Sequence, residues 1–89
     1  MLKQTITIVN KLGLHARAAT KLVKLASHFD SSIKLKRKQR EVNGKSIMGV
    51  MLLAAAKGSE IELSVDGIDE EIAMSQVSDL IKGGFGEEE

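Results

Sequence analysis

The sequence of 89 residues contains no cysteine and no proline, and its only aromatic residues are Phe29 and Phe85. Without cysteine, disulfides and thiolate metal sites are excluded, and the two histidines do not form a recognisable set of metal ligands. The scarcity of aromatic side chains argues against recognition of nucleic acid by base stacking. We therefore expect a function that requires neither a metal nor another cofactor.

The chain also lacks an excess of charge of one sign and a long apolar run. Its 13 Lys and Arg residues nearly balance its 12 Asp and Glu residues, which leaves a formal net charge of +1 at pH 7. Such a balance creates no overall field that would gather nucleic acid or anionic lipid. Met1 leads directly into an alternating segment, with no signal-peptide region and no apolar run long enough to cross a bilayer. We expect a cytoplasmic protein without membrane insertion.

Hydrophobic periodicity predicts one small domain over residues 1–89. Alternating apolar and polar residues predict four strands, at 2–9, 32–36, 40–42 and 60–65. Helical spacing of apolar residues predicts three helices, at 18–29, 47–56 and 69–82. Alternation within the strands indicates that one sheet face is covered and the other is wet, so we predict an α+β fold with helices on an antiparallel sheet. The acidic end, Glu87-Glu88-Glu89, is expected to be a flexible tail.

The segment Gly13-Leu14-His15-Ala16-Arg17 places a histidine and an arginine where a strand ends and a helix begins. The free N–H groups at a helix start bind anions, so Ala16 and Arg17 would offer backbone donors to a phosphoryl group on the imidazole. The Arg17 side chain would add charge-assisted contacts. An exposed loop histidine followed by a solvated arginine is the alternative, because the H-x-R spacing alone is weak evidence. An arginine in a first helical turn opposes the helix dipole, however, which hints at a task other than stability.

The helix predicted after Ser46 carries large apolar side chains in all directions. Because a short helix on a sheet buries about one side, an inward pair such as Val50 and Leu53 would leave others near the surface. The residues left near the surface are Ile47, Met48, Met51 and Leu52. This set is either a methionine-rich docking surface or part of a central core helix, and periodicity does not decide between them.

Ser46 itself fits the N-cap position of that helix. A phosphoryl group on its hydroxyl would be tolerated at a helix N-terminus but would place negative charge beside the apolar surface. Ser46 is therefore either a cap alone or a cap that also serves as a regulatory site.

The most basic stretch of the chain runs from Lys34 to Arg40. One interpretation is a patch for nucleic acid or an acidic partner. The other is a solvated edge hairpin whose lysines discourage sheet-to-sheet aggregation. With no interleaved aromatic residues and almost no net charge, the edge hairpin is favoured. His28, near the end of the first predicted helix, is assigned no chemistry.

Two motifs together, Gly13 to Arg17 and Asn43-Gly44-Lys45-Ser46-Ile47-Met48-Gly49-Val50-Met51, resemble the HPr family of bacterial phosphocarriers. The resemblance covers nearly the whole chain and includes the separation of the two motifs. It implies an open-faced β-sandwich in which three helices cover one face of a four-stranded antiparallel sheet. It also implies that His15 accepts a phosphoryl group on Nδ1 from enzyme I, which takes it from phosphoenolpyruvate, with Arg17 assisting. The acceptors that follow would be IIA domains of the phosphotransferase system.

The resemblance further implies that Ser46 is phosphorylated by an ATP-dependent HPr kinase/phosphorylase. It implies a docking surface for the partner proteins that includes Thr20, Lys24, Ile47, Met48 and Met51. A carrier of this kind is a component of a phosphotransfer chain rather than an independent turnover enzyme. Since it must present one face to successive partners, a monomer is expected.

The family motif usually has proline where this chain has Ala18. Alanine keeps the helix and restores one backbone N–H, so we expect slightly looser phosphate geometry with transfer retained. Two alternatives stay open. One is a nitrogen-branch paralogue with a mainly regulatory task, and the other, of a different class, is a nucleic-acid-binding module that uses the basic hairpin at 34–40.

Overall fold

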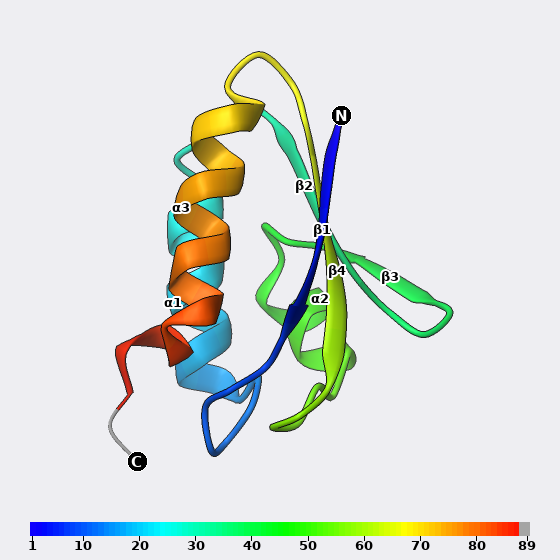
Figure 1. Ribbon diagram of the computed structural model, residues 1–89, viewed down its shortest axis with the longest axis vertical. Coiled ribbons are helices and arrows are strands. Elements are labelled where there is room, and N and C mark those ends of the chain that lie inside the picture. Colours follow the sequence, from blue (N-terminus) through cyan, green and yellow to red (C-terminus); the bar gives the residue numbers. More distant parts are fainter. Residues whose placement is uncertain (88–89) are drawn as a thin grey trace.

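The computed structural model describes residues 1–87 and shows helices layered on one face of a sheet (Figure 1). The elements in chain order are β1 (Leu2–Thr7), α1 (Ala16–Ala26), β2 (Ser32–Arg37), β3 (Arg40–Asn43), α2 (Ile47–Leu52), β4 (Glu60–Asp66), α3 (Glu70–Lys82) and a short 3₁₀ turn, η1 (Gly84–Gly86). The predicted α+β open-faced sandwich is confirmed.

The sheet has the strand order β1-β4-β2-β3, and every neighbouring pair is antiparallel. β4 lies between β1 and β2, with Ile61 opposite Ile6 and Leu63 opposite Leu35. β3 pairs only with β2 and forms one edge. The central position of β4, the last strand in sequence, could not be predicted from alternation, because alternation marks faces and not neighbours.

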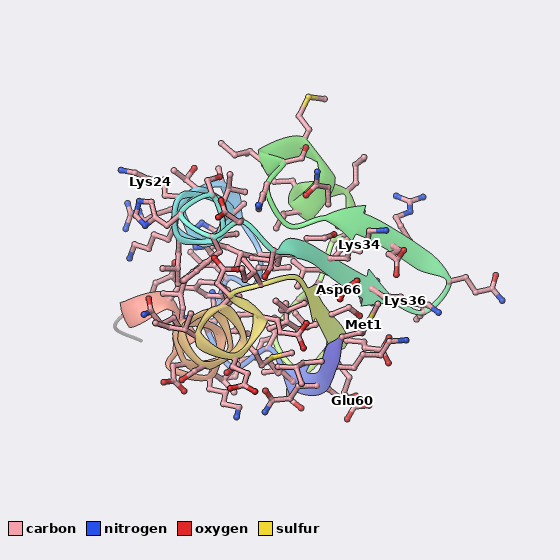
Figure 2. The ribbon with its side chains drawn as sticks, turned by 90° about the horizontal axis from the view of Figure 1, so that it is seen from above. Met1, Lys24, Lys34, Lys36, Glu60 and Asp66 are labelled. Carbon is pink, nitrogen blue, oxygen red and sulfur yellow. The ribbon has the colours of Figure 1, made fainter. Side chains whose placement is uncertain are left out.

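The core lies between the sheet and the helices. Every second strand residue points into it, and α1 and α3 each contribute one apolar stripe, as helical spacing predicts. The fully buried residues of these two helices include Ala18, Ala19, Leu22, Ala26, Ala73, Val77 and Ile81. On the other side of the sheet, Lys34 and Lys36 point away from the helices, whereas Lys24 projects from α1 on the helical side (Figure 2). One face of the sheet is thus covered and the other is wet.

The predicted strand at 2–9 and helix at 18–29 both differ from the structure at their ends. β1 ends at Thr7, although the Ile8 N–H still donates to the Ser59 carbonyl (2.8 Å). α1 begins two residues earlier than predicted, because His15 adopts the extended conformation of an N-cap. It ends at Ala26, since the N–H groups of His28 and Phe29 bond to carbonyls three residues back.

The helix predicted at 47–56 is wrong beyond Leu52. The backbone of Ala54 takes a positive φ of 50°, which stops a right-handed helix. Two side chains of the basic stretch then cap the freed carbonyls: Arg40 donates to Leu52 O (3.0 Å) and Arg37 to Leu53 O (3.3 Å). Two of the basic residues at 34–40 therefore already have a structural partner, which favours the edge-hairpin interpretation over a nucleic-acid patch.

Asp69 ties the beginning of α3 to the segment before β2. Its carboxylate accepts hydrogen bonds from the N–H groups of Asp30 (2.8 Å) and Ser31 (2.9 Å) and from the Ser31 hydroxyl. The Ser31 hydroxyl, followed by the Asp30 N–H, holds the pKa of Asp69 below its ordinary value of 3.8. The ionised form of Asp69 is therefore favoured by folding.

We predict that Asp69→Asn lowers the thermal unfolding midpoint at pH 7 and flattens its dependence on acid. A carboxyl whose pKa is lowered by folding contributes stability above pH 3.8 and loses it as the pH falls through the lowered value. The difference in midpoint between the two proteins should therefore shrink as the pH falls below about 3.8. Thermal unfolding followed by circular dichroism from pH 7 to pH 2 measures it. A difference that stays constant over this range would contradict the assignment.

Candidate functional site

His15 is the N-cap residue of α1, with φ −79° and ψ 179°, and its side chain makes no capping hydrogen bond. The imidazole is therefore not used to complete the helix. The first hydrogen bond of the helix is donated by the Ala19 N–H to the His15 carbonyl (2.8 Å). The preceding N–H groups, those of Ala16, Arg17 and Ala18, have no carbonyl within the helix to bond. His15 thus lies beside a set of free helix donors, as predicted.

The loop before His15 is held against the segment that follows α2. Gly13 adopts a φ of +66°, and a Cβ atom at this position would lie 2.4 Å from the Ala55 carbonyl oxygen. The neighbouring Leu14 N–H donates to the same carbonyl (2.9 Å). Leu14 is itself buried, which fixes the chain immediately before the histidine. Only glycine combines this left-handed backbone with so close an approach.

Arg17 is exposed, and within residues 1–87 its guanidinium has no hydrogen-bonding or ion-pair partner. Its charge is therefore uncommitted, as expected for a side chain that receives an anion. Ala18, where the family motif has proline, lies fully buried in the first turn of the helix. Because α1 forms regularly from Ala16, the alanine leaves the helix start intact.

The C-terminal segment lies over the histidine, which the sequence did not predict. Glu87 Oε2 is 2.5 Å from His15 Nε2, and Glu87 Oε1 accepts a hydrogen bond from the Asn10 amide (2.9 Å). The Asn10 hydrogen bond, and then that with His15, hold the pKa of Glu87 below its ordinary value of 4.5. The expectation of a flexible tail is thus wrong for Glu87, whereas Glu88 and Glu89 lie outside the described residues.

Two further contacts hold this segment in place. Phe85 is buried, and Lys21 of α1 donates to its carbonyl oxygen (2.8 Å). In the sequence, the one indication of this arrangement is Phe85 itself, because an aromatic side chain near the end of a small domain is stabilised by burial. It indicates that the chain folds back onto the core, but it does not indicate where Glu87 lies.

An open hollow of about 530 Å³ lies beside the histidine. Its lining residues are Leu12, His15, Ala16, Arg17, Lys21, Gly86 and Glu87. Two cations, the helix start and one carboxylate thus surround a space large enough for a phosphoryl group that remains accessible from outside. Within residues 1–87 no three His, Asp or Glu side chains are grouped so as to hold a metal ion. Among the same residues, none of the helices is long and apolar enough to cross a membrane.

Ser46 is the N-cap of α2, and its hydroxyl oxygen accepts a hydrogen bond from the Gly49 N–H (3.1 Å). Val50 and Leu53 are buried, as predicted for the inward pair. Four apolar residues beside them are exposed instead: Ile47 (42%), Met48 (77%), Met51 (43%) and Leu52 (58%). The alternative of a central core helix is therefore wrong.

The structure brings the two predicted motifs together. α1 packs against α2, so the start of the histidine helix and the exposed apolar face belong to one region of the surface. Thr20 and Lys24, predicted to join that surface, are both exposed on α1. The Thr20 hydroxyl donates to the Ala16 carbonyl (2.8 Å), while Lys24 points outward from the helix (Figure 2).

Comparison with known proteins agrees with this arrangement. The family model described as "PTS HPr component phosphorylation site" matches residues 2–83. Phosphocarrier protein HPr of Neisseria meningitidis serogroup B is 58% identical over 89 residues, which is 100% of both chains. The chain therefore belongs to the HPr family, the phosphocarriers of the phosphotransferase system.

Solved structures show the same fold. A crystal structure of HPr from Thermoanaerobacter tengcongensis matches with a TM-score of 0.95 and 47% identity, covering 100% of both chains. A crystal structure of an HPr dimer from the same organism matches with a TM-score of 0.78 and 47% identity, covering 98% of this chain and 100% of that one. The HPr of that organism is therefore a dimer in one of its crystal structures.

We predict that Gly13→Ala destabilises the protein more than Gly86→Ala does. Both glycines have a left-handed φ, +66° and +71°, so alanine at either costs about 1–2 kcal/mol of backbone strain. A Cβ at Gly13 also collides with Ala55, whereas at Gly86 nothing lies within 4 Å. The free energy of unfolding of the two variants, measured with urea, separates the effect of the collision from that of the backbone strain. Equal losses of stability in the two variants would show that the loop at Gly13 accommodates the Cβ atom without a loss of its own.

Proposed function

We propose that this protein carries a phosphoryl group on His15 Nδ1 in the cytoplasm. It receives the group from phosphorylated enzyme I, for which phosphoenolpyruvate is the source, and passes it to IIA domains. The observation that carries the proposal is the imidazole at the N-cap of α1, beside unpaired helix N–H groups and the uncommitted Arg17. The family to which the chain belongs gives the donor and the acceptors.

The chemistry follows from that geometry. Neutral imidazole is a nucleophile near neutral pH, and the N–H groups of Ala16 and Arg17 would bond to the oxygens of the phosphoryl group it acquires. The Arg17 guanidinium would add charge-assisted hydrogen bonds. A phosphoimidazole is a good phosphoryl donor because imidazole is a good leaving group, so the same contacts must hold the phosphate without trapping it. One histidine and one arginine do not complete a phosphoryl-transfer site, so each partner supplies the remaining groups.

The docking surface we propose consists of Thr20, Lys24, Ile47, Met48 and Met51. Its support is the exposure of these five residues on two helices that pack together beside the histidine. Methionine side chains adapt to differently shaped partners, which suits a carrier that meets several proteins in turn. A monomer exposes this surface fully, and we propose it as the working form.

Ser46 is proposed as the regulatory site, the substrate of an HPr kinase/phosphorylase. Its hydroxyl caps α2 at the border of the docking surface. Phosphorylation would add about two negative charges at a helix N-terminus, where the dipole tolerates them, beside apolar residues that a partner must cover. The fold would persist while docking weakened.

We predict that His15→Ala abolishes uptake of phosphate from phosphoenolpyruvate and enzyme I. Intact-mass spectrometry should show the phosphorylated species in the wild type and none in the variant. The phosphate should be labile in acid and stable in alkali. His28→Ala is the matched control, because His28 is the other histidine of the chain and lies exposed on the surface. Uptake that persists in His15→Ala would place the phosphate elsewhere.

We predict that Ser46→Asp keeps the fold but slows transfer from enzyme I by about tenfold, because a charge left unpaired in an interface costs on the order of 1–3 kcal/mol. Aspartate is itself a good N-cap, so α2 should be retained. Ser46→Ala is the control: it loses about 1 kcal/mol of stability but introduces no charge. Equal transfer rates for Ser46→Asp and the wild type would contradict regulation through the docking surface.

A further inference from the structure

Glu87, which lies near the C-terminus, contacts the one ring nitrogen of His15 that the proposed transfer does not use. Its Oε2 lies 2.5 Å from Nε2, and the His15 side chain is only 26% exposed there. A carboxylate has no proton to donate, so in the neutral ring the proton of this hydrogen bond must be on Nε2. The proton on Nε2 leaves the lone pair on Nδ1.

The carboxylate is held in place by contacts that do not involve His15. Asn10 is 2% exposed, and its amide donates both to Glu87 Oε1 (2.9 Å) and to the Gly13 carbonyl (2.8 Å). Phe85 anchors the same segment in the core, and Lys21 binds its carbonyl oxygen. The Glu87 side chain is only 11% exposed. Glu87 is therefore held beside His15 by Asn10, Phe85 and Lys21, and not by its contact with the histidine alone.

Nδ1, by contrast, has no hydrogen-bonding partner within residues 1–87. The Glu87 carboxylate holds the Nε2 side of the ring, and the hydrogen bond from the Leu14 N–H to the Ala55 carbonyl fixes the backbone immediately before it. The lone pair on Nδ1 is thus left free. A ring fixed in this way is prepared for attack before any partner arrives.

We propose that Glu87 is a positioning residue that holds His15 in the Nε2–H tautomer and so presents Nδ1 as the nucleophile. This inference rests on the proposed function, since it concerns the same transfer. In the forward step the Nδ1 lone pair forms the new N–P bond, and the bond between phosphorus and the donor group of enzyme I breaks, with its electron pair staying on that donor group. The proton on Nε2 stays where it is. The positive charge that the His15 ring gains is then balanced by the Glu87 carboxylate.

The test compares Glu87→Ala and Glu87→Gln in the full-length protein, labelled with ¹⁵N on histidine. In the wild type the ring signals should be those of the Nε2–H tautomer. Glu87→Ala should shift the signals of His15 toward a tautomer mixture and leave those of His28 unchanged. Glu87→Gln should restore the wild-type signals only in part, because its single amide oxygen can accept from Nε2–H or from the Asn10 amide but not from both.

The kinetic readout is the rate of phosphorylation by enzyme I. Glu87→Ala should lower kcat by roughly 3- to 10-fold with little change in the KM for the carrier, since docking contacts remain. Glu71→Gln is the matched charge control, because Glu71 is exposed in the first turn of α3, at the opposite end of the molecule from the start of α1 (Figure 1).

Unchanged His15 ring signals in Glu87→Ala would overturn the proposal, whether or not transfer slows, because a slower reaction would then arise from docking. These outcomes differ from failure of the proposed function. If the wild type takes up no phosphate on His15, the phosphocarrier assignment fails, while the ring signals still report whether Glu87 sets the tautomer.

Discussion

The hydrogen bond from the Leu14 N–H to the Ala55 carbonyl is the contact on which the site depends. It joins the loop before α1 to the segment after α2, two parts of the chain that are about 40 residues apart. Gly13 permits the approach because any Cβ there would collide with the same carbonyl. One contact thus fixes both the histidine at its helix start and the position of that helix relative to the docking surface.

A phosphocarrier must bind its phosphate without retaining it, and the charges around His15 suit this balance. Arg17 is uncommitted and exposed, so its attraction for an anion is screened by water. The helix donors are partial charges rather than full ones. The hollow beside the ring stays open, which leaves room for a partner to approach the phosphoryl group. Tight binding would require burial, and burial would obstruct onward transfer.

The fold class could be predicted because alternation and helical spacing report directly which side of each element is buried. The strand order could not, since it depends on contacts between distant segments such as the pairing of Ile6 with Ile61. The end of α2 was missed for a similar reason: Arg37 of β2 and Arg40 of β3 donate to the carbonyls at its end. The pattern of apolar residues within a helix cannot indicate a capping residue that comes from a distant part of the chain.

Some residues of the candidate site could likewise be predicted from the sequence, and others could not. His15, Arg17 and Ser46 lie at helix starts, which sequence signals mark well, and all three were placed correctly on these elements. Glu87 was missed because three consecutive glutamates at a chain end are typical of a solvated tail. Its contact with His15 requires Phe85 in the core and Asn10 beneath it, and both are tertiary features.

The most direct test of the central claim is a ¹H–¹⁵N correlation spectrum of the protein phosphorylated by phosphoenolpyruvate and enzyme I, with ¹⁵N-labelled histidine. The phosphocarrier assignment predicts phosphorus–nitrogen coupling at Nδ1 of His15 and a retained proton on Nε2. Coupling at Nε2, or a phosphorylated protein in which neither nitrogen of His15 couples to phosphorus, would contradict it.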